Sequence, residues 1–115
     1  MSFKSVHWEA GARTFGQGQI SVSYEHLVKI FGKPDPDAGD DFKTDAHWVL
    51  EFEDGMIATV YNWKNGPKYG GPDIKWVLEW NVGGFGPEAF DRIVEVLGPA
   101  CKVVFRYNYL PAKKT

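Results

Sequence analysis

Residues 62–73 (NWKNGPKYGGPD) hold the side chains best suited to binding chemistry in this chain. Five side chains of this stretch could face a ligand: Asn62, Trp63, Lys64, Lys68 and Tyr69. An aromatic ring can stack on a planar base while a lysine pairs with a phosphate, so this mixture suits a small nucleotide-like ligand. Long loops in small domains are often binding loops. Alternatively, the stretch is a solvated turn in which Trp63 packs over a sheet edge.

The glycines at 83–84 are a second candidate contact, because they lead from a predicted strand into a predicted helix. Free amides and the helix dipole favour an anion at such a point. The sequence matches neither the G-x-G-x-x-G pattern nor a Walker loop, and Pro87 removes one amide. Arg92 and Arg106 lie opposite the apolar positions of their own elements and could recognise a phosphate or carboxylate. We therefore add Gly83, Gly84, Arg92 and Arg106 to the candidate ligand contacts.

Metal and catalytic patterns are not found. The acidic stretch 33–46 would need glycine and glutamate where Asp40 and Ala46 stand if it were a calcium loop beginning at Asp35. None of the three histidines has metal-ligand spacing with another or with Cys101, which we expect to be a buried apolar residue. No G-x-S-x-G nucleophile motif occurs. The sequence predicts no metal, no cofactor and no enzymatic activity.

Composition indicates one ordinary globular domain. The chain has 115 residues, 43% of them hydrophobic, and a formal net charge of −2, which argues against general nucleic-acid binding. A single cysteine cannot form an internal disulfide. No apolar run approaches the roughly 18 residues of a membrane span, and the N-terminus has no apolar signal segment. We expect a cytoplasmic protein of one domain covering residues 1–115, with no membrane contact.

Periodicity then places the elements that must position the candidate residues. Residues 24–31 have an apolar helical face, with Ser23 as N-cap and Gly32 as the stop. Alternation predicts strands at 47–53, 56–62 and 74–82, the first two joined by a two-residue turn at Asp54-Gly55.

The remaining chain contains a second helix and a last strand. The helix begins at Pro87 and stops before Gly98-Pro99, and the strand covers 101–109. We expect residues 1–19 to be loosely ordered apart from an edge strand near 3–8, and residues 111–115 to be frayed. The predicted fold is α+β: a four- or five-stranded, mostly antiparallel sheet with a β-meander at 47–82 and two helices packed on one face.

The segment 24–97 contains four short motifs: Phe31-Gly32-x-Pro34, Trp48-Val49-x-x-Phe52-x-Asp54-Gly55, Tyr61-Asn62-Trp63-Lys64 and Trp80-Asn81-Val82-Gly83-Gly84. In these motifs the segment resembles small phage-encoded accessory proteins. This resemblance implies a non-enzymatic antagonist of host defence, acting in the cytoplasm of an infected bacterium. No family site is carried over to individual residues.

Two kinds of antagonist remain open. One sequesters a small nucleotide-like ligand, and could do so as a homo-oligomer. The other is a protein–protein inhibitor of a host defence complex, similar to anti-CRISPR proteins. It would use exposed aromatic residues as anchors, or the acidic loop as a mimic of nucleic acid. The high aromatic content, 16% of the chain, suits either.

Overall fold

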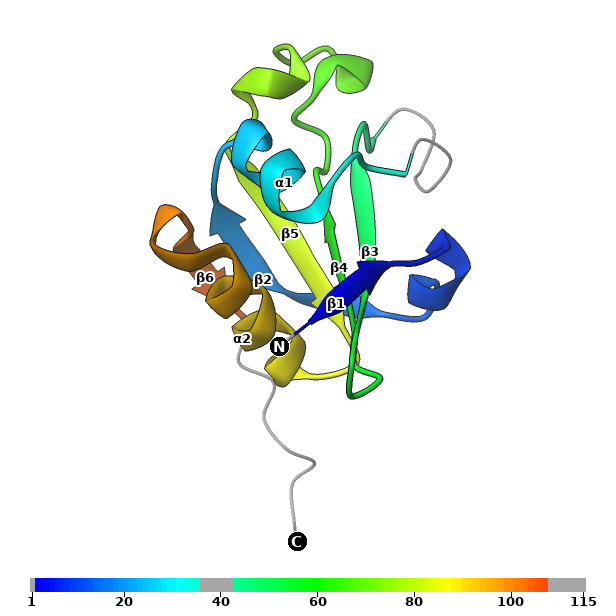
Figure 1. Cartoon of the computed structure of the whole chain (residues 1–115). Coiled ribbons are helices and arrows are strands. Elements are labelled where there is room, and N and C mark those ends of the chain that lie inside the picture. Colours follow the sequence, from blue (N-terminus) through cyan, green and yellow to red (C-terminus); the bar gives the residue numbers. More distant parts are fainter. Residues whose placement is uncertain (1, 36–42, 108–115) are drawn as a thin grey trace, which may run out of the picture.

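A computed structural model describes residues 2–35 and 43–107, and these form a six-stranded sheet with two α-helices (Figure 1). The strands are β1 (Phe3–Ser5), β2 (Phe15–Ser21), β3 (His47–Phe52), β4 (Ile57–Tyr61), β5 (Glu79–Gly84) and β6 (Lys102–Arg106). Their order is β1-β3-β4-β5-β2-β6, with antiparallel neighbours throughout. The helices are α1 (Tyr24–Phe31) and α2 (Pro87–Leu97). Asp37, Asp40 and Asp41 of the acidic stretch, and the tail 111–115, lie outside the described residues.

The α+β class and the β3-β4-β5 meander are confirmed, but the predicted number of strands is wrong. The sheet has six strands because residues 15–21 form β2, between β5 and β6. The sequence FGQGQIS hides this strand, since its glycines resemble a flexible loop. Gly18 is needed there because a Cβ would lie 2.6 Å from Cε2 of Phe90 on α2. The edge strand predicted near 3–8 is β1, which pairs with β3.

Two boundaries in the meander also differ from prediction. Residues Ile74–Trp76 form a 3-10 turn instead of the start of the predicted strand 74–82. The Lys75 N–H donates to Asp73 Oδ1 at 3.1 Å and caps this turn. Strand β5 therefore begins at Glu79. The β3–β4 turn has three residues, 53–55, closed by the Phe52 N–H donating to the carbonyl of Met56 at 2.9 Å. The last residue of a three-residue hairpin loop typically has a positive φ. Gly55 occupies this position, with a φ of 88°.

Both helices begin and end where the sequence predicts. The Ser23 hydroxyl accepts a hydrogen bond from the His26 N–H at 3.1 Å, which caps the first turn of α1. Gly32 ends α1 with a φ of 86°, and Gly98 ends α2 with a φ of 74°. Neither helix, within the described part of the chain, is long and apolar enough to span a bilayer.

Two buried tryptophans form the centre of the core. The rings of Trp48 on β3 and Trp80 on β5 meet edge to face, with centroids 5.5 Å apart at 66°. Each indole N–H donates to a main-chain carbonyl, that of Gly32 at 2.8 Å for Trp48 and that of Val22 at 3.0 Å for Trp80. Buried indoles need such a partner. Tyr24 of α1 packs against both rings.

Helix α2 reaches the sheet at Gly84. Trp80, Val82 and Gly84 alternate along β5, so they share one side of that strand. A Cβ at Gly84 would overlap the Cβ of Ala89 on α2, so the missing side chain sets how closely this helix approaches. Figure 1 shows both helices in front of the central strands.

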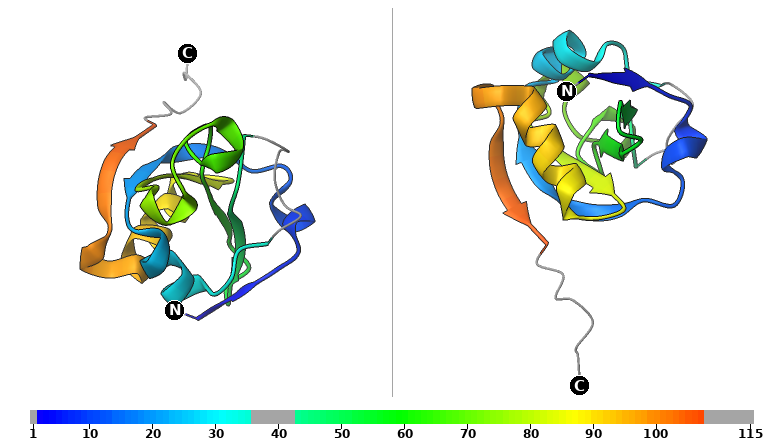
Figure 2. Two further views of the ribbon diagram at one scale, coloured as in Figure 1. Left: turned by 90° about the horizontal axis from the view of Figure 1, so that it is seen from above. Right: turned by 60° about the horizontal axis from the view of Figure 1, so that its bottom comes forward.

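The other side of the sheet, the outer face, carries the residues that alternate with the core positions, among them Val49, Thr59, Tyr61 and Asn81. Part of it is covered by the β1–β2 connection, where Gly11 packs against Val49 and Thr59. The part near Tyr61 and Asn81 stays accessible. Figure 2 shows β6 at the margin of the sheet, beside β2.

Candidate functional site

The loop between β4 and β5 is held by the buried amide of Asn62. Its Oδ1 accepts from the N–H groups of Asp45 at 2.8 Å and Ala46 at 2.9 Å. Its Nδ2 donates to Asp45 Oδ2 at 2.8 Å and to Asn65 Oδ1 at 3.2 Å. Asn62, predicted as a ligand contact, is 0% exposed. Its hydrogen bonds hold the conformation of the loop.

Asp45 extends this network to the rest of the loop. Its Oδ1 accepts from the Lys68 N–H at 2.9 Å, so the backbone of Lys68 is anchored while its side chain is exposed. Gly66 sits directly against the Asp45 carboxylate, where a Cβ would overlap Oδ2. The loop therefore has a defined conformation built on Asn62 and Asp45.

Three of the predicted contacts come together at the loop surface. Trp63 is 42% and Tyr69 is 46% exposed. The Lys64 amine lies 5.9 Å from the ring centroid of Trp63 and 5.8 Å from that of Tyr69. A second amine, Lys43 Nζ, lies 5.5 Å from the Trp63 centroid. The Lys64 N–H donates to the Lys43 carbonyl at 2.7 Å, which fixes the two segments side by side.

A groove of about 350 Å³ opens beside Trp63 on the outer face. It is lined by Gly16, Tyr61, Trp63, Asn81 and Tyr107. The rings of Tyr61 and Trp63 meet edge to face at 6.5 Å and 85°, and form part of this lining. The Tyr107 ring lies against Gly16, where an added Cβ would be 3.4 Å from Cε2 of that ring.

The strand register places amides between aromatic rings. Tyr61 on β4 is paired with Asn81 on β5, and Asn81 is paired with Gln19 on β2. Gln19 is in turn paired with Phe105 on β6. Directly paired residues point to the same side of a sheet, so these four form a row across four strands of the outer face. Phe105 also meets Tyr107 edge to face, with centroids 5.2 Å apart.

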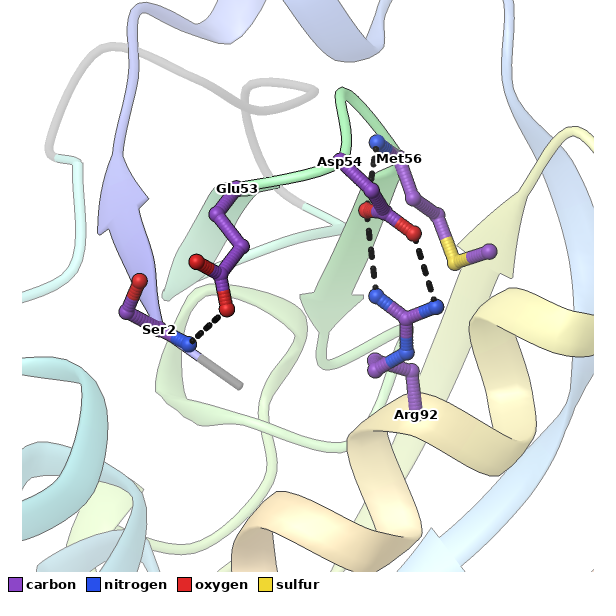
Figure 3. A network of polar contacts seen from close by, with 5 residues as sticks. All are labelled: Ser2, Glu53, Asp54, Met56 and Arg92. Atoms are coloured by element: carbon purple, nitrogen blue, oxygen red, sulfur yellow. Dashed lines mark hydrogen bonds and ion pairs between the residues drawn. The ribbon is translucent and has the colours of Figure 1, made fainter.

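Each of the two predicted arginines, Arg92 on α2 and Arg106 on β6, has an acidic partner. Arg92 donates to both carboxylate oxygens of Asp54, in the β3–β4 turn (Figure 3). These hydrogen bonds, with one from the Met56 N–H, hold the pKa of Asp54 below its ordinary value, and the pKa of Arg92 is raised. Arg106 forms an ion pair with Asp91 at 2.8 Å. Neither arginine lines the groove.

The two predicted glycine contacts are buried in β5. Gly83 lies against Thr59 on the outer face, where a Cβ would overlap Oγ1, and Gly84 lies against Ala89. Both pair with strands on either side, Gly83 with Gly16 and Thr59. Their place in the fold is explained by close packing between strands and with α2.

Residues 2–35 and 43–107 contain no cluster of three or more histidine, cysteine, aspartate or glutamate side chains that could hold a metal ion. Burial raises the pKa of the Cys101 thiol, as expected of a packed cysteine, here directly before β6.

Sequence reasoning missed five residues of this surface: Gly16, Lys43, Tyr61, Asn81 and Tyr107. Tyr61 and Asn81 occupy outward positions of two predicted strands, which was a usable signal, but their pairing depends on register.

Comparison of the chain with protein-family models, with curated proteins and with solved structures finds no match in any of the three.

Proposed function

We propose that this protein is a non-enzymatic binding protein that sequesters a small nucleotide-like ligand in the outer-face groove. The observation that carries the proposal is the lining of the groove by the rings of Tyr61, Trp63 and Tyr107. Aromatic rings stack on any planar base, and stacking contributes about 1–3 kcal/mol per base. In the setting that the phage resemblance implies, the ligand would be a signal of host defence.

The lysines beside Trp63 supply the complementary charge. Lys43 and Lys64 both place an amine within 6 Å of the Trp63 centroid, at 5.5 and 5.9 Å. Long lysine side chains can move from the ring to a bound phosphate while their backbone stays in place. A ligand with a flat ring and a phosphate would thus use the groove and the lysines together.

Isothermal titration with mononucleotides, cyclic di- and trinucleotides and ADP-ribose derivatives tests the proposal. Trp63→Ala should weaken binding of the nucleotide that binds by about 5- to 150-fold, the equivalent of one stacked base. Trp76→Ala is the matched control, because Trp76 is also exposed and also carries a lysine, Lys75, at 5.7 Å from its ring centroid, but lies outside the groove. If no nucleotide binds, or if both variants weaken binding equally, the proposal fails.

A protein–protein inhibitor is the second candidate, and strand β6 favours it. Val103, Val104 and Phe105 are 49%, 44% and 39% exposed, and within the described ranges β6 pairs with β2 alone. Exposed apolar edges can accept a strand of another chain. Val104→Lys should then abolish co-purification of a host defence protein that Trp63→Ala still retains. The opposite pattern would exclude β6 as the docking edge.

A further inference from the structure

We infer that Asn81 selects the base, and that the groove recognises the N6–N7 edge of an adenine nucleotide. The inference rests on the proposed function and adds the ligand class and the residue that determines specificity. It follows from the position of the Asn81 amide, which lines the groove together with the aromatic rings.

The position of Asn81 is the first step. Asn81 lies on β5 between Tyr61 and Gln19 in the register of the outer face, and it lines the groove with Tyr61, Trp63 and Tyr107. It is half-buried, and its side chain has no hydrogen-bond partner in residues 2–35 and 43–107. The neighbouring Gln19 amide has none there either. A polar group in this setting is available to a ligand.

The chemistry of the amide is the second step. A carboxamide presents one donor beside one acceptor. On the N7 side of the bases, adenine alone offers a donor beside an acceptor, whereas guanine offers two acceptors, cytosine one donor and uracil one acceptor. A base that stacks against the aromatic rings directs an edge toward the strand, where the Asn81 amide can bind it through two hydrogen bonds.

The charges set the direction of the ligand. In the anti conformation of a 5′-nucleotide, the phosphate lies on the C8–N7 side of the purine. A purine whose N7 side faces Asn81 thus keeps its phosphate close to the protein, and the Lys43 and Lys64 amines lie beside Trp63, which lines the same groove. The opposite edge of adenine would then face away from the protein.

The four mononucleotides and one adenine analogue separate this arrangement from others. In isothermal titrations, AMP should bind about tenfold more tightly than GMP, CMP or UMP, the discrimination of one bidentate contact. It should also bind more tightly than 7-deaza-AMP, which lacks the N7 acceptor but keeps the other edge. An adenine trinucleotide is titrated alongside, and the tighter binder shows whether the adenine comes from a free nucleotide or from a strand.

Variants of Asn81 complete the test. Asn81→Leu, similar in size but unable to hydrogen-bond, should bind all four mononucleotides equally. Asn81→Asp, which can only accept, should shift the preference toward CMP, whose N4 amine donates. Ser21→Ala is the control, since Ser21 is on the same strand as Gln19, outside the groove, and it should keep the adenine preference.

The outcomes distinguish the two proposals. If nucleotides bind in a Trp63-dependent way but AMP and 7-deaza-AMP bind equally, or if Asn81→Leu keeps the adenine preference in a folded protein, this inference is overturned and the binding function stands. If no nucleotide binds, both are overturned. Thermal melts of each variant show whether it is folded.

Discussion

The guanidinium of Arg92 donates two hydrogen bonds to the carboxylate of Asp54, from Nη1 to Oδ1 at 3.2 Å and from Nη2 to Oδ2 at 3.0 Å. This pair joins the middle of α2 to the tip of the β3–β4 hairpin (Figure 3). The guanidinium also lies over the ring of Phe52, 4.9 Å from its centroid. The preceding residue of the helix, Asp91, forms an ion pair with Arg106 of β6. Consecutive residues of α2 therefore tie it to distant parts of the sheet.

The first prediction concerns the pH dependence of this pair. Because the pKa of Asp54 in the folded protein lies below its ordinary value of 3.8, the ionised carboxylate stabilises the fold above pH 3.8, and this contribution is lost as the pH falls through the lower folded pKa. Asp54→Asn should lower the melting temperature at neutral pH, and the difference from the native protein should shrink in melts recorded below pH 3.8.

Glu51→Gln serves as the control for that experiment. Glu51 makes an ion pair with Lys4 at 3.8 Å, and both side chains are exposed. Such pairs contribute little, so this variant should melt almost like the native protein. A loss equal to that of Asp54→Asn would contradict a special role for the Arg92 pair.

Gly84→Ala should destabilise the protein because α2 packs directly on this residue. The new Cβ would overlap the Cβ of Ala89, and overpacking of this kind costs about 1–3 kcal/mol. Denaturant unfolding measures the change. Gly16→Ala provides the comparison, since its Cβ would meet Tyr107 at an ordinary contact distance of 3.4 Å. Equal losses for the two variants would show that α2 can move away freely.

Asn62→Leu should lower the free energy of unfolding and loosen the β4–β5 loop. The variant leaves the half-buried N–H of Asp45 and the buried N–H of Ala46 without their acceptor, and an unsatisfied buried group costs about 1–3 kcal/mol. Hydrogen exchange at Ala46 should become faster. Asn65→Ala, which removes a more exposed amide, should have a smaller effect, and the reverse order would refute the role assigned to Asn62.

The Cys101 thiol should react slowly with thiol reagents in the folded protein. Burial raises its pKa above the ordinary 9.0, which lowers the fraction of reactive thiolate at neutral pH, and packing also limits access. The rate of a colorimetric thiol assay should rise severalfold in denaturant. Equal rates in the two conditions would place the thiol on an accessible surface.

Local sequence signals predicted the helices and most strands of this fold. Ser23 and Gly32 set the ends of α1 because capping chemistry is local. Strand β2 was missed because Gly18 is required by a tertiary contact with Phe90 that no local pattern encodes. The turn at Asp54-Gly55 was placed correctly, but its length depends on the pairing of Phe52 with Met56.

The candidate site was predictable only in part. Trp63, Lys64 and Tyr69 come together because they are close in sequence. Asn81 and Tyr107 join Trp63 through strand order and register, which depend on long-range pairing. Arg92 was predicted as a ligand contact, yet it binds Asp54, 38 residues away in the chain.

The edge-to-face contact of Trp48 with Trp80 has an optical consequence. Two indoles 5.5 Å apart and inclined at 66° have transition dipoles close enough to couple, so the folded protein should show an exciton couplet in its circular dichroism spectrum. The couplet depends on the mutual orientation of the two rings, and it would vanish in Trp48→Phe or when the core melts. It thus distinguishes unfolding of the core from changes at the exposed Trp63, which lies outside the pair.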